Sequence, residues 1–379
     1  MTAVPARVVE ATTRGTVSTR HTPYRVGVGH HGACSRRPGS APPGRSPCAP
    51  EAAITTPTSR PATPAAGAGT PGAGEFGLIA AITAGQQQPP GTLLGPGDDA
   101  ALVAAPDGRV VVSTDVLVDG VHFRSDWATP EQIGRRAALA SVADIAAMGA
   151  VPTAFVVGLC VPADTSGDVV LGIGRGLHAV AAEIGAGVVG GDLTRSEVLT
   201  VSVTVLGDLR GARPVVRSGA RPGDLLALAG RVGWAAAGLA VLSRGFRSPA
   251  SMVNAYREPQ PPLAAGPVAA ALGATAMIDV SDGLVADVGH IAEASGVAID
   301  IRSTALDLNP RLVEVAAALG KDPLTWVLTG GDDHALVATF PADTALPAPW
   351  EPIGRVGEGS GVTVDGSAYE GAGGWDHFR

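Results

Sequence analysis

The sequence contains few cysteines, and this limits the ways in which the chain can be stabilised. Its 379 residues include three cysteines, Cys34, Cys48 and Cys160. Their number is odd and no two of them have the spacing of a metal-ligand pair, which argues against a disulfide framework and against a cysteine-based metal site. A reducing environment fits best, and we therefore expect a cytoplasmic protein.

Long hydrophobic runs and an excess of positive charge are also absent. Apolar stretches such as VPTAFVVGLCV, residues 151–161, are shorter than the roughly 20 residues of a membrane-spanning helix and are typical of buried strands. With 27 basic and 35 acidic side chains the net charge is -8, which argues against a nucleic acid or an anionic membrane as a partner. If the chain binds phosphates, metal ions must help to hold them.

Two familiar devices for binding nucleotides are missing as well. The chain has no GxxxxGK[ST] P-loop, and it lacks the set of Gly-rich loop, HRD and DFG motifs that protein kinases use. The glycines of GGDLTRS at 190–196 and of VSDGL at 280–284 can bring backbone N–H groups close to an anion. Ordinary turns explain these glycines equally well.

The composition divides the chain near residue 70. Residues 1–70 are rich in Pro, Ser, Thr, Arg, Gly and Ala without an apolar period, so we expect a disordered, low-complexity extension. The chain is 45% hydrophobic, which is enough to build the cores of roughly two domains. We place these domains at residues 71–212 and 213–379.

The pattern beyond residue 70 predicts a mixed α/β chain. Strand-like runs occur along it, WVLTG at 326–330 among them, and helical segments separate several of these runs. One helix is expected to begin after the N-cap Thr129, with Pro130 at its first position, and to stop at Gly149. Asp144 lies on the apolar face of this helix, where a buried carboxylate needs a metal ion, a salt bridge to an arginine or a helix-end hydrogen bond.

Further aspartates recur beside apolar runs. Asp98 lies in a Gly/Pro turn before such a run, and we expect the others to lie where an apolar run ends. They are Asp115, Asp192, Asp279, Asp282, Asp332 and Asp333. Repeated carboxylates at strand ends suit hard cations such as Mg²⁺, with Ser113 and Thr114 as further oxygen donors. Because Mg²⁺ takes few protein carboxylates, the pattern indicates several ions around one polyphosphate.

The order of the motifs in residues 72–379 resembles the thiamine-monophosphate kinase family. The motifs are GPGDDAALV, STDVLVDGVHF, ADIAAMGA, GGDLTRS, RSGARPGD, DVSDGL, GGDDHALV and GGWDHF. The resemblance implies an aminoimidazole ribonucleotide synthetase-like fold of two domains, in which the N-terminal halves of a homodimer form a β-barrel and the C-terminal half is an α/β domain. It also implies ATP-dependent phosphorylation of thiamine monophosphate to thiamine diphosphate, the last step of thiamine diphosphate biosynthesis.

The same resemblance implies roles for individual residues. The metal ligands would be Asp98, Ser113, Thr114, Asp115, Asp144, Asp192, Asp279 and Asp282, and the catalytic residues among them Asp98, Asp115 and Asp282. The co-substrate ATP would contact Gly191, Asp192, Arg217 and Ser281. Thiamine monophosphate would contact His122, Asp332 and Trp375.

One motif departs from the family pattern. The usual GGEDYEL is GGDDHAL here, so that Asp332 replaces a glutamate, His334 a tyrosine and Ala335 a second glutamate. A shorter carboxylate misses its hydrogen bond or reaches the substrate through water. Two alternatives stay open at this point: another ATP-dependent synthetase or dehydratase of the superfamily, and a non-catalytic nucleotide or metal sensor.

Removal of residues 1–70 is expected to leave the melting temperature and the kinase activity nearly unchanged, because this segment has too little apolar content to pack. Thermal unfolding and turnover of the shortened and the full chain provide the comparison. A large loss of stability would show that the segment folds against the rest of the chain.

Overall fold

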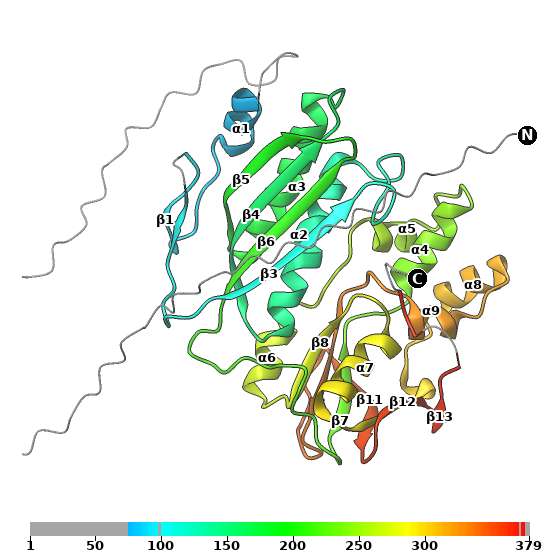
Figure 1. The fold of residues 1–379 in the computed structure, drawn as a ribbon. Coiled ribbons are helices and arrows are strands. Elements are labelled where there is room, and N and C mark those ends of the chain that lie inside the picture. The colour runs from blue at the N-terminus through cyan, green and yellow to red at the C-terminus, as the bar shows by residue number, and fades with distance from the viewer. Residues whose placement is uncertain (1–74, 98–99, 371–372, 376–379) are drawn as a thin grey trace, which may run out of the picture. The chain divides into compact units, whose positions relative to one another are not determined.

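A four-stranded and a seven-stranded sheet, each with helices packed on it, make up the structure (Figure 1). The computed structural model describes residues 75–97, 100–370 and 373–375. These residues lie in one compact unit. Within these ranges, no helix combines the length and the apolar character needed to cross a membrane.

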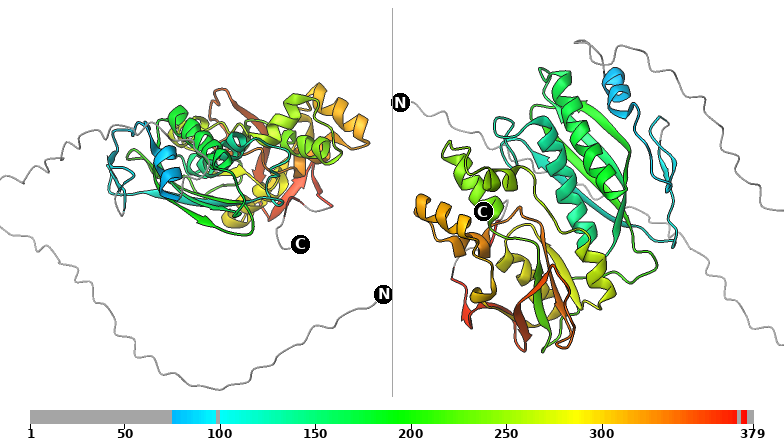
Figure 2. Two further views of the ribbon diagram at one scale, coloured as in Figure 1. Left: turned by 90° about the horizontal axis from the view of Figure 1, so that it is seen from above. Right: turned by 180° about the vertical axis from the view of Figure 1, so that it is seen from behind.

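The first half of the chain is built on the four-stranded sheet. Its strands run in the order β3 (Val111–Val118), β6 (Thr200–Asp208), β4 (Val151–Val161) and β5 (Gly187–Arg195). The helices α2 (Pro130–Ala147) and α3 (Gly167–Ile184) lie side by side on one face of it (Figure 2). α1 (Glu75–Thr83) packs on α3, and β1 (Thr92–Leu94) pairs with β2 (Leu102–Val103). Within the described residues this sheet is open, with β3 and β5 at its edges.

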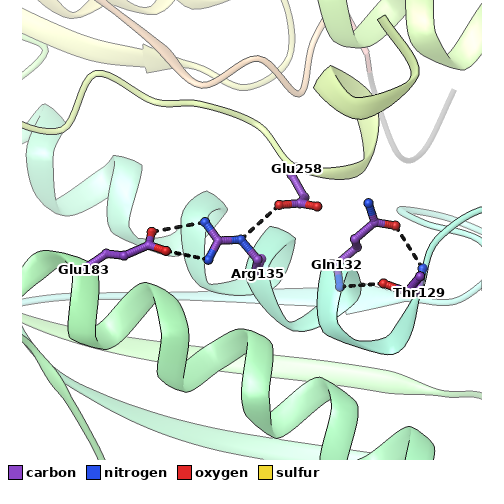
Figure 3. A network of polar contacts seen from close by, with 5 residues as sticks. All are labelled: Thr129, Gln132, Arg135, Glu183 and Glu258. Carbon is purple, nitrogen blue, oxygen red and sulfur yellow. Dashed lines mark hydrogen bonds and ion pairs between the residues drawn. The ribbon is translucent and has the colours of Figure 1, made fainter. Parts of the chain in front are cut away.

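Helix α2 begins as the sequence predicts. The Thr129 side chain accepts a hydrogen bond from the Gln132 backbone N–H, and the Gln132 side chain accepts one from the Thr129 backbone, which forms a capping box (Figure 3). Pro130 occupies the first turn, as expected. The helix ends at Ala147, two residues before the predicted stop at Gly149.

Glycines bring α2 and α3 into close contact. A Cβ atom at Gly134 would lie 2.1 Å from the Ile173 carbonyl oxygen, and one at Gly176 would lie 2.0 Å from the Glu131 carbonyl oxygen. A side chain at either position would therefore push the two helices apart. This close packing fixes which face α2 turns to the sheet, and so fixes the direction of its functional side chains.

The second half of the chain is built on the seven-stranded sheet. Its strands run in the order β13 (Ser367–Ala368), β12 (Gly361–Val364), β9 (Ala298–Ile301), β11 (Trp350–Gly357), β7 (Leu225–Ala229), β10 (Ala335–Phe340) and β8 (Ala276–Val280). β12 and β9 are parallel and the other pairs are antiparallel. The helices of this half are α4 (Trp234–Ser243), α5 (Ala250–Arg257), α6 (Ala265–Ala271), α7 (Leu284–Ser295), α8 (Pro310–Leu319) and α9 (Pro323–Thr329), with a short 3₁₀ turn at Ser303–Ala305.

The expected mixture of helices and strands is confirmed, with one local correction. The run WVLTG, predicted as a strand, is the end of helix α9. Asp322 caps this helix by accepting a hydrogen bond from the Leu324 N–H, and Pro323 occupies its first turn. The run is too short for its period to separate a strand from a helix, and the cap and proline before it decide the outcome.

Buried side chains gather mainly within each half. One cluster packs Phe155, Ile173 and Val203 between the four-stranded sheet and its helices. A second cluster lies within residues 220–356, in the second half of the chain. A third, smaller cluster joins Ala146 at the end of α2 to Phe340 in β10. The third cluster shows that the end of α2 is packed into the second half, and the boundary near residue 212 stays a prediction.

Candidate functional site

A cavity of about 680 Å³ lies where the two halves meet. Strand β3, the segment after it and helix α2 contribute to its lining, together with α4, Tyr256 and residues 281–282, 329–332, 334 and 374–375. Its volume suits a small-molecule ligand. Seven of the predicted site residues lie on its wall: Thr114, Asp115, His122, Ser281, Asp282, Asp332 and Trp375.

Strand β3 places one pair of predicted ligands towards α2. Asp115 lies in the middle of this strand and not at its end, so the expectation that it ends an apolar run is wrong. Side chains alternate along a strand, and the inward residue Leu117 is buried, so Ser113 and Asp115 point to the same face as Leu117. The Ser113 hydroxyl donates a hydrogen bond of 2.5 Å to Asp144 of α2.

Asp144 is the centre of a group of negative charges. The pKa of its carboxyl group is raised to about 7, mainly by burial and in addition by the nearby charges of Asp279 and Asp115, against the hydrogen bond from Ser113. The prediction that Asp144 points inward is confirmed. Among the described residues its partner is a hydroxyl group and no arginine pairs with it. A cation would relieve this crowding of carboxylates.

Asp279 has an unexpected neighbour in the altered motif. The Nδ1 atom of His334 lies 3.0 Å from its Oδ2 atom, and both side chains are buried. Burial alone would lower the pKa of His334, but the hydrogen bond and the charge of Asp279 outweigh it and leave the pKa raised. Strand pairing fixes this contact, because Leu336 of β10 lies opposite Asp279 of β8.

The turn that carries Asp282 is held by three other segments. Its backbone N–H and that of Gly283 donate to the carboxylate of Asp287, at 3.1 and 3.0 Å. Its carbonyl accepts the N–H of Trp375 at 3.0 Å. Gly283 has φ +142°, and a Cβ atom there would lie 2.8 Å from the Thr329 carbonyl oxygen, so only glycine fits. Sequence reasoning missed Asp287, although a buried acid in the first turn of a helix is the signal for this kind of cap.

The two aspartates of the GGDDHAL motif point in different directions. Asp332, at φ +67°, forms an ion pair of 2.8 Å with Arg136 of α2. Asp333 is buried and accepts the N–H groups of Trp234 and Ala235, so it caps helix α4. Burial raises the pKa of Asp333 to about 7. Of the two adjacent aspartates, Asp332 alone faces the cavity.

Arg136 was not predicted from the sequence. Its side chain is 4% exposed, although it lines the cavity. The signal was present, since Arg136 lies eight residues before Asp144 and therefore near the same face of α2. An arginine on the apolar face of a helix requires an anionic partner.

His122 and Trp375 also line the cavity. The Nδ1 atom of His122 accepts the Val118 N–H at 3.0 Å, so the neutral ring carries its proton on Nε2. Trp375 is 62% exposed and lines the cavity. A broad indole face and an imidazole N–H are groups that can contact a planar organic cation and its phosphate.

Thr114 lies on the cavity wall with its side chain on the other face of the sheet from Asp115, and two further predicted residues, Gly191 and Asp192, do not line the cavity. The hydroxyl group of Thr114 accepts a hydrogen bond from that of Thr204 in β6. Only the backbone of Thr114 could therefore share a metal ion with the Asp115 side chain. Asp192 lies on that same opposite face of β5, three strands or about 14 Å from β3. Gly191 has a structural reason to be glycine, since a Cβ atom there would lie 2.2 Å from the Val157 carbonyl oxygen.

Arg217 is held at the far end of α7. Its carbonyl oxygen accepts a hydrogen bond of 3.1 Å from the hydroxyl group of Ser295, which is the last residue of α7. Ser281 lies before the first residue of the same helix. The helix separates the two positions by roughly 18 Å. Asp98 lies outside the described residues. The roles of these residues in binding ATP and metal stay predictions.

The donor atoms at the cavity fit Mg²⁺ without forming a closed cage. In the described part of the chain, no group of three or more His, Cys, Asp or Glu side chains is arranged to hold a metal ion. Mg²⁺ is usually bound by one or two carboxylates, with water and phosphate oxygens as its other ligands. The charges of Asp115 and Asp279 both act on the carboxyl group of Asp144, and all three side chains are hard oxygen donors.

Comparison with known proteins places this geometry in a family. The chain is 52% identical over 307 residues to a thiamine-monophosphate kinase of Mycobacterium tuberculosis strain H37Rv, covering 80% of this chain and 92% of the relative. The chain belongs to the thiamine-monophosphate kinase family. The model for the N-terminal domain of AIR synthase related proteins matches residues 97–209.

Solved structures of thiamine-monophosphate kinases have the same fold. The crystal structure of the protein from Stenotrophomonas maltophilia K279a is 35% identical and has a TM-score of 0.69, covering 77% of this chain and 96% of that chain. AaThiL complexed with AMPPCP and TMP is 33% identical and has a TM-score of 0.68, covering 80% of this chain and 97% of that chain. That protein therefore binds an ATP analogue and thiamine monophosphate together.

The crowding around Asp144 gives a prediction for the metal-free protein. Its pKa of about 7 in the folded chain lies above the ordinary value of 3.8, so the stability that protonated Asp144 contributes is lost as the pH rises from about 4 to about 7. Asp144→Asn is neutral at any pH and still accepts the Ser113 hydrogen bond. We expect it to raise the melting temperature at pH 8 by about 3 °C or more, and to change it little at pH 5.

Added Mg²⁺ provides the second half of this test, since it is expected to stabilise the wild type at pH 8 more than the variant. Asp126→Asn serves as the control, because Asp126 is an exposed partner of Arg124 whose pKa is lowered by that pairing. Its replacement should not stabilise the protein. A melting temperature of Asp144→Asn below that of the wild type at pH 8 without metal would contradict the account of Asp144.

Proposed function

We propose that this chain transfers the γ-phosphoryl group of ATP to thiamine monophosphate, forming thiamine diphosphate and ADP. The observation that carries the proposal is 52% identity to a thiamine-monophosphate kinase over 92% of that relative. The structure of AaThiL with AMPPCP and TMP supports it, since that protein has the same fold. The cavity between the two halves is large enough for an organic cation with its phosphate.

Direct in-line transfer is the mechanism that the site residues support. A terminal phosphate oxygen of thiamine monophosphate attacks the γ-phosphorus, the bond between that phosphorus and the β,γ-bridging oxygen breaks, and ADP leaves. The acceptor phosphate is already ionised near neutral pH, so no general base and no covalent protein intermediate are needed. Positioning and charge stabilisation therefore supply most of the rate.

The carboxylates are the residues that would hold Mg²⁺. Asp115 and Asp282 line the cavity, Asp144 and Asp279 lie behind them, and Asp98 is proposed to join them. Several bound Mg²⁺ ions would neutralise two polyanions that otherwise repel each other. In this arrangement the chain's own contribution is a fixed backbone: Asp282 is held by Asp287 and Trp375, and Asp144 by Ser113.

An acceptor assay tests the proposed function. The protein is incubated with MgATP and with either thiamine monophosphate or thiamine, and ADP is measured. We expect turnover with thiamine monophosphate only, and none when Mg²⁺ is chelated, because thiamine lacks the ionised phosphate that attacks. Equal rates with both acceptors would refute the reaction, and tight binding of MgATP without any turnover would identify a sensor instead.

Replacing a carboxylate on the cavity wall is expected to reduce turnover strongly. Asp115→Asn and Asp282→Asn should each lower kcat about a hundredfold or more while the protein stays folded, since a charge that holds metal acts mainly on the transition state. Steady-state kinetics and a melting curve measure the two effects. Asp333→Asn is the comparison, because Asp333 caps a helix and does not line the cavity. Near-normal turnover of both cavity variants would show that their aspartates are structural.

We also propose a homodimer in which a second copy covers the open face of the four-stranded sheet and completes a β-barrel. Helices cover one face of this sheet. On the other, Val112, Val116 and Val156 are 58%, 50% and 40% exposed. β3 is also an unprotected edge strand, which favours pairing with another chain. The predicted ligands Thr114 and Asp192 also point to this face, where a second copy would lie close to them.

A charge on the open sheet face is expected to dissociate this dimer. Val116→Asp should convert a dimer to a monomer in sedimentation equilibrium, because a charged side chain is costly to bury in an apolar interface. Val313→Asp, on the exposed side of α8, should leave the mass unchanged. A wild-type protein that sediments as a monomer at micromolar concentration would contradict the homodimer.

The cytoplasm remains the compartment that we propose for the protein.

A further inference from the structure

Arg136 is a buried charge whose contacts are fixed on several sides. Its Nη1 atom donates to the backbone carbonyl of Tyr256, and its guanidinium carbon lies 4.7 Å from the centre of the Tyr256 ring. Its Nη2 atom lies 2.8 Å from Oδ1 of Asp332. A planar guanidinium group that is held by the backbone carbonyl and by the ring of Tyr256 cannot rotate freely. Arg136 therefore presents its remaining N–H groups in one direction, towards Asp332.

Asp332 depends on this contact for its own position. Its backbone N–H is bound to the Ser281 carbonyl at 2.8 Å, and its φ of +67° turns the chain sharply at this residue. Its side chain is 43% exposed and lines the cavity. A carboxylate has two oxygens, so pairing one of them with Arg136 still leaves capacity to accept a hydrogen bond from a ligand. Without Arg136, the short side chain would be free to turn into solvent.

The location of the pair indicates which substrate it serves. Arg136 and Asp332 share the cavity wall with His122 and Trp375, the residues expected to contact thiamine monophosphate. The crowded carboxylates around Asp144 and Asp279 have His334 as their basic neighbour, and His334 is also close enough to Asp332 and Arg136 for their charges to act on it. A carboxylate held near an organic cation favours its binding, and it accepts hydrogen bonds from amino groups on a ring.

We propose that Arg136 is a positioning residue for the acceptor substrate: it holds the Asp332 carboxylate in the orientation that binds thiamine monophosphate. The arginine compensates for the loss of a methylene group where GGDDHAL has aspartate in place of glutamate. The inference rests on the proposed function. It adds a residue, and a pairing across the two halves of the chain, that the family motifs do not contain.

Kinetics of variants at Arg136 provide the test. Arg136→Met keeps the length and apolar contact of the side chain but removes the fork, and we expect it to raise KM for thiamine monophosphate about tenfold. KM for ATP should stay within about twofold and kcat within about threefold, because the contact is equally strong in the ground and transition states. Arg136→Lys should lie between wild type and Arg136→Met, since an ammonium group cannot bridge a carbonyl and a carboxylate in the same way.

A double-mutant cycle and a matched control separate positioning from structure. Asp332→Asn should raise KM for thiamine monophosphate by a similar factor, and the double variant should be no worse than about twofold beyond either single variant. Arg135→Met is the control. Arg135 also lies on α2 and forms ion pairs with Glu258, which follows α5, and with Glu183 of α3 (Figure 3), but it does not line the cavity. It should leave KM for thiamine monophosphate within about twofold.

Three results would overturn the inference. They are multiplicative effects of Arg136→Met and Asp332→Asn, equal rises in KM for ATP and for thiamine monophosphate, and an Arg135→Met variant that behaves like Arg136→Met. If Arg136→Met does not fold, the affinity of Arg136→Lys and of Asp332→Asn for thiamine monophosphate is measured by calorimetry in the presence of Mg²⁺ and AMPPCP. An affinity equal to that of the wild type in both variants would refute the inference. A wild-type chain that neither binds nor phosphorylates thiamine monophosphate would instead refute the proposed function.

Discussion

The site depends on one constraint, the packing of α2 between the two halves of the chain. Glycines allow its backbone to touch α3 on one side, and a Cβ atom at Gly266 of α6 would lie 2.0 Å from the Ala146 carbonyl oxygen on the other. With so little freedom, the helix cannot slide or rotate without a clash. Its two charged inward residues, Arg136 and Asp144, are therefore set at fixed points between the halves. Each of them meets a partner from a different part of the chain.

This rigidity explains how the protein keeps several carboxylates close together. Like charges at short distance raise one another's pKa, and each would move apart if the backbone allowed it. Asp144 is held by Ser113, the Asp282 turn by Asp287, and Asp279 by its strand pairing and by His334. The structure thus stores an unfavourable charge distribution that bound cations relieve. Such preorganisation suits a reaction in which charge stabilisation accounts for most of the rate.

The altered GGDDHAL motif shows how changes in sequence are accommodated locally. His334 stands where the family motif has tyrosine, and it contacts the buried Asp279 directly. Asp332 stands where the motif has glutamate, and its shorter side chain is paired with Arg136. Asp333, which the motif retains, is a helix cap. One substitution therefore gives the buried Asp279 a basic partner, and the other shortens a side chain on the cavity wall that Arg136 pairs with.

The sequence by itself determined the class of fold, the helix that begins at Thr129, the inward direction of Asp144 and the family, because capping, helical period and motif order are local properties of the chain. It could not distinguish a strand from a helix at 326–330, where the run is too short to show a period. Nor could it separate Asp115 from Asp192, since both are aspartates in apolar surroundings. Only the tertiary structure decided that these two lie on opposite faces of one sheet, three strands apart, and that Arg136 meets Asp332 across the cavity. Strand order and helix packing join residues far apart in the chain, and no local pattern records such contacts.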